Sequence, residues 1–240
     1  MDEFKGNAGG EKFQCIITDP EHKKVLDILP NRKAEDLYAY FLKYKDRHNV
    51  KYIVMDMSGP YRYLAKTVFP KAQIIADKYH VVRQVNWAFE NVRKTEQKKF
   101  NEQRRKYFKR SRKVLLKRPE DLTTDEAYQV ESISKISERL RQAYVLKNEF
   151  YKVMDSSNSY EAKKQLAKWY MLASGYNLPE FDDCFKAFTN WQKEILNSFD
   201  NPYTNGFTEG INNKIKVIKR NAFGMQNFDR FRNRILHALA

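Results

Sequence analysis

The chain has 240 residues, 42% of them hydrophobic, which is enough for one large domain or one domain with a sizeable insertion and excludes wholesale disorder. Lysine and arginine outnumber aspartate and glutamate by 45 to 30, and the formal charge of +15 favours a polyanionic partner over a basic protein without a nucleic-acid role. The two cysteines, Cys15 and Cys184, exclude a disulfide framework and a zinc-finger spacing, and no apolar run approaches the roughly 18 residues of a membrane span.

The N-terminal segment predicts a β-hairpin followed by a helix. Residues 12–18, KFQCIIT, are rich in β-branched and aromatic side chains and precede the turn sequence DPEHKK, so they predict a strand. Residues 24–29, KVLDIL, predict the second strand of the hairpin. Residues 34–44 carry apolar side chains at helical spacing and predict a helix.

Two buried strands, each ending in an aspartate, are predicted next. Residues 50–56, VKYIVMD, form a continuous apolar run that ends at Asp56, and residues 72–77, AQIIAD, form a shorter run that ends at Asp77. Between them, the sequence Ser-Gly-Pro opens a predicted helix over residues 58–69. This succession of strands and helices predicts an α/β fold with a mixed sheet.

The middle of the chain, from about residue 78 to residue 200, is helical in pattern and strongly basic, and it contains no convincing strand. Further helices are predicted over residues 123–153, 159–173 and 181–198, after Gly206, and around 226–239. We therefore expect a core built from residues 1–80 and 200–240 that is interrupted by an all-helical insertion over residues 81–199.

Four acids are candidates for metal chemistry. Asp2, Asp56 and Asp77 lie at or beside predicted strand ends, and Glu209 opens a predicted helix. Clustered carboxylates at strand ends hold hard cations such as Mg²⁺, and two such ions stabilise the attacking and leaving oxygens of phosphoryl transfer. For any one of these acids taken alone, a role as a cap or turn residue is the better interpretation.

Two basic stretches are candidates for DNA contact. Residues 98–118, KKFNEQRRKYFKRSRKVLLKR, predict a helix face that follows phosphates, and a solvated charged helix is the alternative. The cations that we expect to bind DNA are Arg104, Arg105, Lys109 and Arg110 in this stretch, and Lys216, Lys219 and Arg220 after Glu209. The three tryptophans, Trp87, Trp169 and Trp191, lie among apolar residues at helical spacing, which predicts core packing for each.

Three blocks of the chain, in this order, resemble the catalytic part of the ISL-three family of bacterial insertion-sequence transposases. They are DEFKGNAGGEKFQCIITD, VMDMSGPYRYLAKTVFPKAQIIADKYHVVRQVN and NPYTNGFTEGINNKIKVIKRNAFGMQNFDRFRNRI. The resemblance covers about residues 2–239 and implies a DDE transposase with a ribonuclease-H-like core. It also implies that Asp2, Asp56 and Glu209 are the three catalytic ligands of Mg²⁺ or Mn²⁺.

Asp77 competes with Asp56 for the second position of this ligand set. Asp77 forms an Asp-x-x-His pattern with His80, and related transposases carry such a motif downstream of the second acid. We therefore prefer Asp56 and expect Asp77 and His80 to be a supporting pair. A histidine hydrogen-bonded to Asp77 at the start of a helix, without a catalytic role, is an equally good interpretation of His80.

The activity that the resemblance implies is metal-assisted strand cleavage followed by strand transfer, with transposon ends and target DNA as partners and a homodimer on DNA. The expected location is the cytoplasm, in association with the nucleoid. Family members usually carry N-terminal zinc-binding and helix-turn-helix segments, which this chain lacks before Asp2, so we expect a truncated protein with impaired end recognition. The alternatives are a catalytically impaired remnant that only binds DNA and a ribonuclease-H-like nuclease of other function.

Overall fold

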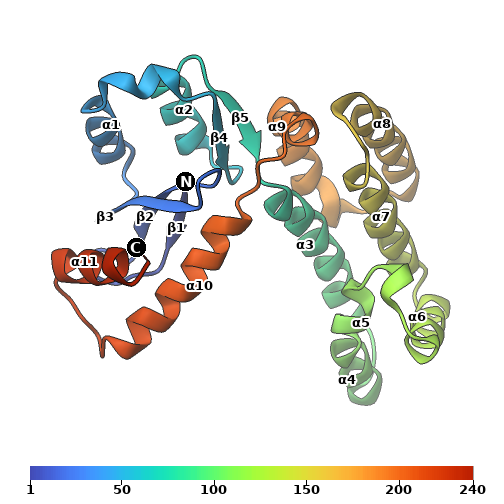
Figure 1. Cartoon of the computed structure of the whole chain (residues 1–240). Helices are drawn as coiled ribbons and strands as arrows, with labels where there is room; N and C mark the ends of the chain where they lie inside the picture. Colours follow the sequence, from blue (N-terminus) through green and yellow to red (C-terminus); the bar gives the residue numbers. More distant parts are fainter. Residues whose placement is uncertain (240) are drawn as a thin grey trace. The chain divides into compact units, whose positions relative to one another are not determined.

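The computed structural model describes residues 1–239, and its backbone divides into two compact units (Figure 1). The first, the core unit, consists of Met1–Asp77 and Asn201–Ala240. The second, the helical unit, consists of Lys78–Asp200. The helical unit is therefore inserted into the sequence of the core unit.

The core unit begins with an antiparallel sheet of three strands in the order β1-β2-β3. These strands are β1, Asp2–Phe4, β2, Gln14–Asp19, and β3, Lys24–Leu29. The turn between β2 and β3 directs the chain back on itself, and Ile16 of β2 lies opposite Ile28 of β3. The hairpin predicted from the two apolar runs is confirmed.

A second, parallel sheet consists of β4, Tyr52–Met55, and β5, Gln73–Ala76. Helix α2, Gly59–Val68, connects these two strands, as parallel pairing requires a crossover. The α/β class is confirmed, but the strands form two small sheets and not the single mixed sheet that we expected. The amino group of Met1, next to β1, donates one hydrogen bond of 3.3 Å to the Val54 carbonyl of β4, and a single bond does not make a ladder.

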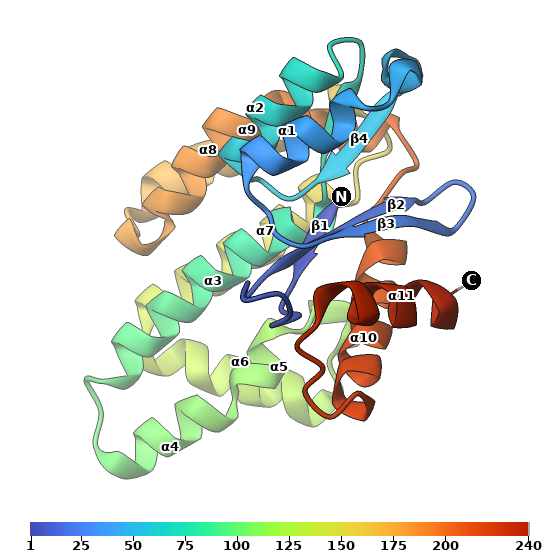
Figure 2. The same cartoon turned by 90° about the vertical axis from the view of Figure 1, so that its left-hand side faces the viewer.

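Helices cover both faces of the three-stranded sheet. Figure 2 shows α1, Ala34–Leu42, and α2 on one side, and α10, Gly206–Asn221, and α11, Phe228–Leu239, on the other. Because side chains alternate along a strand, Ile17 of β2 packs in the cluster beneath α1 and α2, whereas Ile16 packs in the cluster with α10 and α11. Both faces of β2 are thus buried.

The helical unit contains no strand within the residues that the structure describes, as its sequence predicted. Its helices are α3, Lys78–Gln97, α4, Glu102–Arg110, α5, Arg112–Leu116, α6, Thr124–Ile136, α7, Glu138–Met154, α8, Ser159–Tyr176, and α9, Asp182–Asp200. The helix expected over residues 123–153 is two helices, because Ser137 has extended backbone and its side chain accepts a hydrogen bond from the Leu140 N–H to cap α7. None of the described helices is both long and apolar enough to cross a membrane.

Aromatic packing forms the core of the helical unit. Trp169 is 2% exposed, donates to the Leu146 carbonyl at 2.8 Å and contacts Phe150, and Trp191 is 3% exposed, so core packing is confirmed for both tryptophans. The same prediction is wrong for Trp87, which is 53% exposed. Helix α3 buries a different face, which includes Phe89, and therefore leaves Trp87 in solvent.

Candidate metal centre and nucleic-acid interface

The acids Asp77 and Glu209 come together in the core unit. Asp77 follows β5 directly, and its backbone N–H continues the sheet by donating to the Met55 carbonyl at 2.9 Å. Glu209 lies in the first turn of α10. One carboxylate oxygen from each residue lies within 4.8 Å of the other. Two carboxylates at this spacing offer the oxygen ligands that hard divalent cations prefer.

The start of α10 is tied to both sheets, which fixes Glu209 in place. The buried residue Asn205 donates its backbone N–H to the Asp77 carboxylate at 3.2 Å, and its carbonyl accepts from the Glu209 N–H at 2.9 Å. The hydroxyl groups of Thr208 and Thr18 of β2 are 2.8 Å apart. Asn205 therefore links the two acids through the backbone, so that their spacing does not depend on flexible side chains alone.

His80, the expected partner of Asp77, belongs to the helical unit. It lies in the first turn of α3, three residues after Asp77 along the chain, and is only 8% exposed.

Asp2 and Asp56 lie near this pair but do not belong to the group within 4.8 Å. Asp2, in β1, accepts a hydrogen bond of 2.9 Å from the Asn212 side chain, and Asn212 is buried one turn after Glu209 on α10. Asp56 follows the last residue of β4. Burial lowers the pKa of the Met1 amino group, and the charges of Asp2, Asp56 and Asp77 all oppose that shift.

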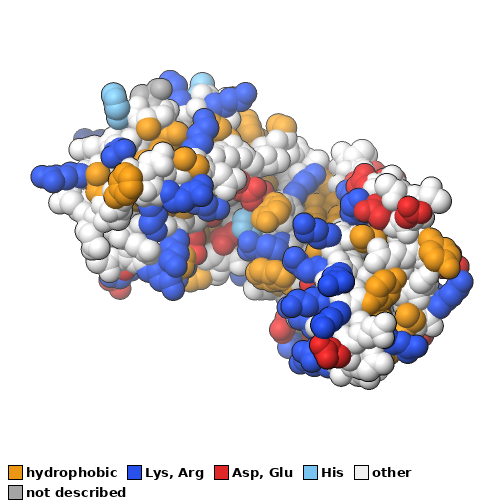
Figure 3. Space-filling view, turned by 90° about the horizontal axis from the view of Figure 1, so that it is seen from below, with side chains coloured by type: hydrophobic (Ala, Val, Ile, Leu, Met, Phe, Trp, Pro, Cys, Tyr) orange, Lys and Arg blue, Asp and Glu red, His pale blue; other side chains and the backbone are white. Residues whose placement is uncertain are grey.

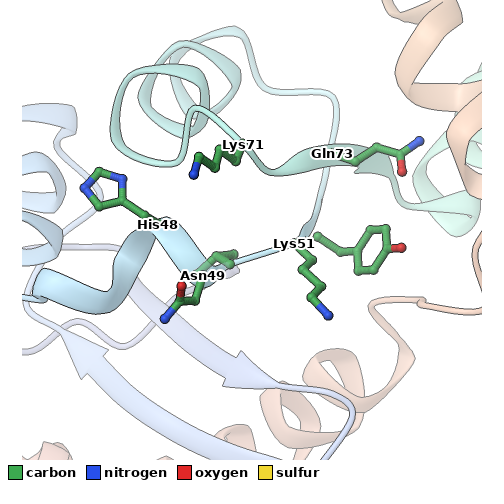
Figure 4. A pocket seen from close by; sticks show the side chains of 7 residues that line it. His48, Asn49, Lys51, Lys71 and Gln73 are labelled. Carbon is green, nitrogen blue, oxygen red and sulfur yellow. The ribbon is translucent and has the colours of Figure 1, made fainter.

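A hollow of about 610 Å³ opens at the other end of the parallel strands (Figure 4). It is lined by His48, Asn49, Val50, Lys51, Tyr52, Lys71 and Gln73. The lining lies at the amino-terminal ends of β4 and β5, whereas Asp56 and Asp77 follow their carboxyl-terminal ends. With two lysines and no carboxylate, this hollow is not the candidate metal centre.

Helix α4 presents a basic surface, and Figure 3 shows lysine and arginine side chains gathered on the helical unit. The predicted DNA-binding residues Arg104, Arg105, Lys109 and Arg110 are all exposed, and none of them makes an ion pair with a residue in the described part of the chain. Phe108 is the buried residue of α4, so a single apolar anchor leaves the rest of the helix in solvent.

The predicted cations of α10 differ from one another. Lys216 and Arg220 are exposed, whereas the Lys219 ammonium donates to the Lys5 carbonyl at 3.0 Å. Burial and the nearby charge of Lys5 lower the pKa of Lys219. Lys219 thus anchors α10 to the segment after β1, while Lys216 and Arg220 face solvent.

Sequence reasoning missed an exposed stack of aromatic and cationic side chains on α3. The Arg83 guanidinium lies 4.7 Å from the centre of the Trp87 ring and 5.8 Å from that of Tyr79. Tyr79 is 57% exposed. Successive spacings of four residues in the sequence were the available signal, since they place all three side chains on one helix face. Exposed aromatic rings interleaved with arginine are typical of surfaces that bind nucleic acids.

Comparison with known proteins identifies relatives along the whole chain. A family model described as a transposase, DDE_Tnp_ISL3, matches residues 1–235. The chain is 27% identical over 236 residues to the transposase for insertion sequence element IS1001 of Bordetella parapertussis, which covers 96% of this chain and 58% of that protein. It is 30% identical over 125 residues to the transposase for IS1557 of Mycobacterium tuberculosis, covering 52% of this chain and 28% of that protein.

A further relative carries a different name. A Lactococcus lactis protein named an ATP-dependent protease is 32% identical over 107 residues, which cover 45% of this chain and 33% of that protein. No solved structure matches the chain. Since the chain spans little more than half the length of the IS1001 transposase and about a third or less of the other two, a relative's complete activity is not transferred to it by similarity alone.

Proposed function

Because the chain belongs to the ISL-three family of insertion-sequence transposases, we propose that it is the catalytic part of a transposase that cleaves DNA strands at the ends of an insertion sequence and joins them to target DNA. The observation that carries the proposal is the pair of carboxylates, Asp77 and Glu209, within 4.8 Å of each other on a chain with a net charge of +15. A pair of acids brought together at a strand end and a helix start, in so basic a protein, suits metal-dependent chemistry on a polyanion.

We propose further that the five strands belong to a ribonuclease-H-like core formed by residues 1–80 and 200–240, with residues 81–199 as its helical insertion. The hydrogen bond from Met1 to the Val54 carbonyl supports adjacency of β1 and β4. The division of the chain into Met1–Asp77 with Asn201–Ala240 and Lys78–Asp200 supports the boundaries to within a few residues.

The donor set fits Mg²⁺ or Mn²⁺ as the proposed cofactor. Ligand oxygens at about 2.1 Å from one ion are at most ~4.2 Å apart, so a small side-chain rotation of Asp77 or Glu209 is enough to bind it jointly. The family resemblance points to Asp2, Asp56 and Glu209 as the ligands, whereas the geometry brings Asp77 next to Glu209. Both assignments include Glu209. They differ in whether Asp56 or Asp77 is the second acid, whose removal should abolish metal binding.

The chain's own residues have distinct roles in this proposal. When bound, a divalent ion would lower the pKa of a water molecule and neutralise charge on the scissile phosphate. Asn205 and Asn212 hold the carboxylates of Asp77 and Asp2 by hydrogen bonds, so these acids are oriented before the ion binds. We expect His80, three residues after Asp77 in the sequence, to be a supporting residue that positions the scissile phosphate.

DNA is the proposed partner, and a homodimer on DNA is the proposed assembly. The exposed cations of α4 and of α10 are suited to phosphate contact, because they make no competing ion pair with another described residue. They are Arg104, Arg105, Lys109 and Arg110 of α4, and Lys216 and Arg220 of α10. Sedimentation with and without a duplex tests the assembly.

Calorimetric titration with Mn²⁺ and Mg²⁺ tests the metal site, followed by nicking of supercoiled plasmid. We compare the wild type with Asp56→Asn, Asp77→Asn and Glu209→Gln, and use Glu21→Gln, an exposed acid of the β2–β3 turn, as the matched control. Glu209→Gln is expected to abolish both binding and nicking, and the control to change neither. Loss of binding in Asp77→Asn but not in Asp56→Asn assigns the second ligand to Asp77, and the reverse result assigns it to Asp56. A wild type that binds DNA but neither metal refutes the proposal.

A further inference from the structure

The turn between α10 and α11 exposes a large apolar side chain completely. Phe223 is 96% exposed, more than any other large hydrophobic residue among those the structure describes. Its backbone φ is 49°, and that of the next residue, Gly224, is 81°. Two successive residues therefore lie in the left-handed region, and one of them is a phenylalanine.

Neither packing nor backbone preference accounts for a phenylalanine at this position. A positive φ brings the Cβ atom of an L-residue close to the following carbonyl oxygen, and a bulky residue is a genuine outlier there. A glycine or asparagine would satisfy the turn with less strain. Because strained residues that the surrounding structure maintains cluster at functional sites, the ring itself requires an explanation.

The turn is held firmly at its base while the ring projects from it. Lys219, in the last turn of α10, donates to the Lys5 carbonyl at 3.0 Å. On the other side of the turn, the Gln226 carbonyl accepts from the Gly9 N–H at 2.8 Å. The segment after β1 thus forms hydrogen bonds with the residues on both sides of the turn. These bonds restrain the turn that carries Phe223.

The segments of α10 and α11 that flank Phe223 in the sequence are strongly basic. Across residues 214–234 the single acid is Asp229. The exposed cations of this stretch are Lys214, Lys216, Arg220, Arg230 and Arg234. An exposed apolar side chain between two basic segments suits a ligand with a negatively charged exterior and an apolar interior. Duplex DNA, with phosphates outside and stacked bases inside, is such a ligand.

We propose that Phe223 is a wedge that inserts between stacked base pairs of duplex DNA lying along α10. The choice of DNA as the ligand rests on the proposed function. Glu209 and Phe223 lie near opposite ends of α10, and fourteen residues at 1.5 Å per residue separate them by about 21 Å. At 3.4 Å per base pair, the wedge acts about six base pairs from the phosphodiester that Glu209 faces.

The test measures unstacking directly with 2-aminopurine, whose fluorescence rises when it leaves the base stack. We use 30-base-pair duplexes that each carry one 2-aminopurine at a different pyrimidine–purine step, in EDTA so that cleavage does not occur. The wild type is expected to raise fluorescence at one or more steps. Phe223→Ala and Phe223→Gly are expected to reduce that rise at least fivefold. Tyr63→Ala, which removes a 74% exposed ring from α2 in the same unit, is the matched control and is expected to leave it unchanged.

Phe223→Gly keeps the fold testable, because glycine adopts the positive φ without strain and should raise the melting temperature while it removes the wedge. The proposal is overturned if both Phe223 variants unstack DNA like the wild type, or if the wild type unstacks no step. It is also overturned if Phe223→Ala converts a DNA-free dimer into monomers, because the ring then packs against a second copy.

If the wild type unstacks DNA but neither binds metal nor nicks plasmid, the proposed function fails and the wedge stands. If the wild type nicks plasmid without unstacking any step, the wedge fails and the proposed function stands.

Discussion

Lys147 of α7 is the most deeply buried cation of the helical unit, and its titration should govern how that unit responds to pH. The side chain is 0% exposed, its ammonium donates to the Lys117 carbonyl at 2.8 Å, and it lies 4.8 Å from the Tyr144 ring. Burial, followed by repulsion from Arg118, lowers the pKa of Lys147 from 10.5 to about 7. The hydrogen bond and the aromatic ring therefore compensate only part of the cost of burying the charge.

The sign of the pH dependence follows from the lowered pKa. In the unfolded chain the lysine regains its ordinary pKa, so between about pH 7 and 10.5 the unfolded chain binds a proton that the folded chain does not. The free energy of unfolding therefore rises with pH across this window and falls as the pH is lowered toward 7. At 1.36 kcal/mol per pKa unit, the change across the whole window is on the order of 5 kcal/mol.

Lys147→Met should remove this dependence, because methionine fills similar space without a charge. We expect urea unfolding at pH 7, 8, 9 and 10 to show a steep rise in the free energy of unfolding for the wild type and a flatter profile for the variant. At pH 7 the variant should have the higher free energy of unfolding. The gain is reduced by about 1 kcal/mol, because the Lys117 carbonyl loses its hydrogen-bond donor. Lys168→Met, an exposed lysine on α8, is the control and should keep the wild-type slope. Parallel profiles for Lys147→Met and the wild type would refute the reasoning.

Three further outcomes are expected. Asn212→Ala removes the donor that orients Asp2 and should weaken Mn²⁺ binding about tenfold in calorimetry; unchanged affinity would exclude Asp2 from the site. Phe223→Gly relieves a positive φ and should raise the free energy of urea unfolding by about 1 kcal/mol, whereas a decrease would show that the ring stabilises the fold. The double variant Arg104→Ser with Arg105→Ser should lower the slope of log affinity for duplex DNA against log salt by up to about two, and an unchanged slope would place the DNA elsewhere.

Much of the fold could be predicted because its signals are local. The hairpin of β2 and β3 follows from two β-rich runs around a turn sequence, and β4 and β5 follow from apolar runs that end in aspartate. The exposure of Trp87 could not be predicted, because helical periodicity says that a face is apolar but not which neighbour covers it. The break between α6 and α7 at Ser137 was missed as well. A serine within a helical pattern can continue the helix or cap a new one, and its backbone conformation, which the pattern does not show, decides between the two.

Charge and periodicity depend only on near neighbours along the chain, so the order of residues alone was enough to establish the basic surface, the order of the elements and the acids at strand ends. Which of those acids meet depends instead on the folded chain. Asn205 and Asp77 are 128 positions apart, yet their hydrogen bond places Glu209 next to Asp77, while Asn212 draws Asp2 to the same helix. These contacts depend on how α10 packs against the sheet through residues such as Ile211, and that packing is a property of the assembled core that no local pattern encodes.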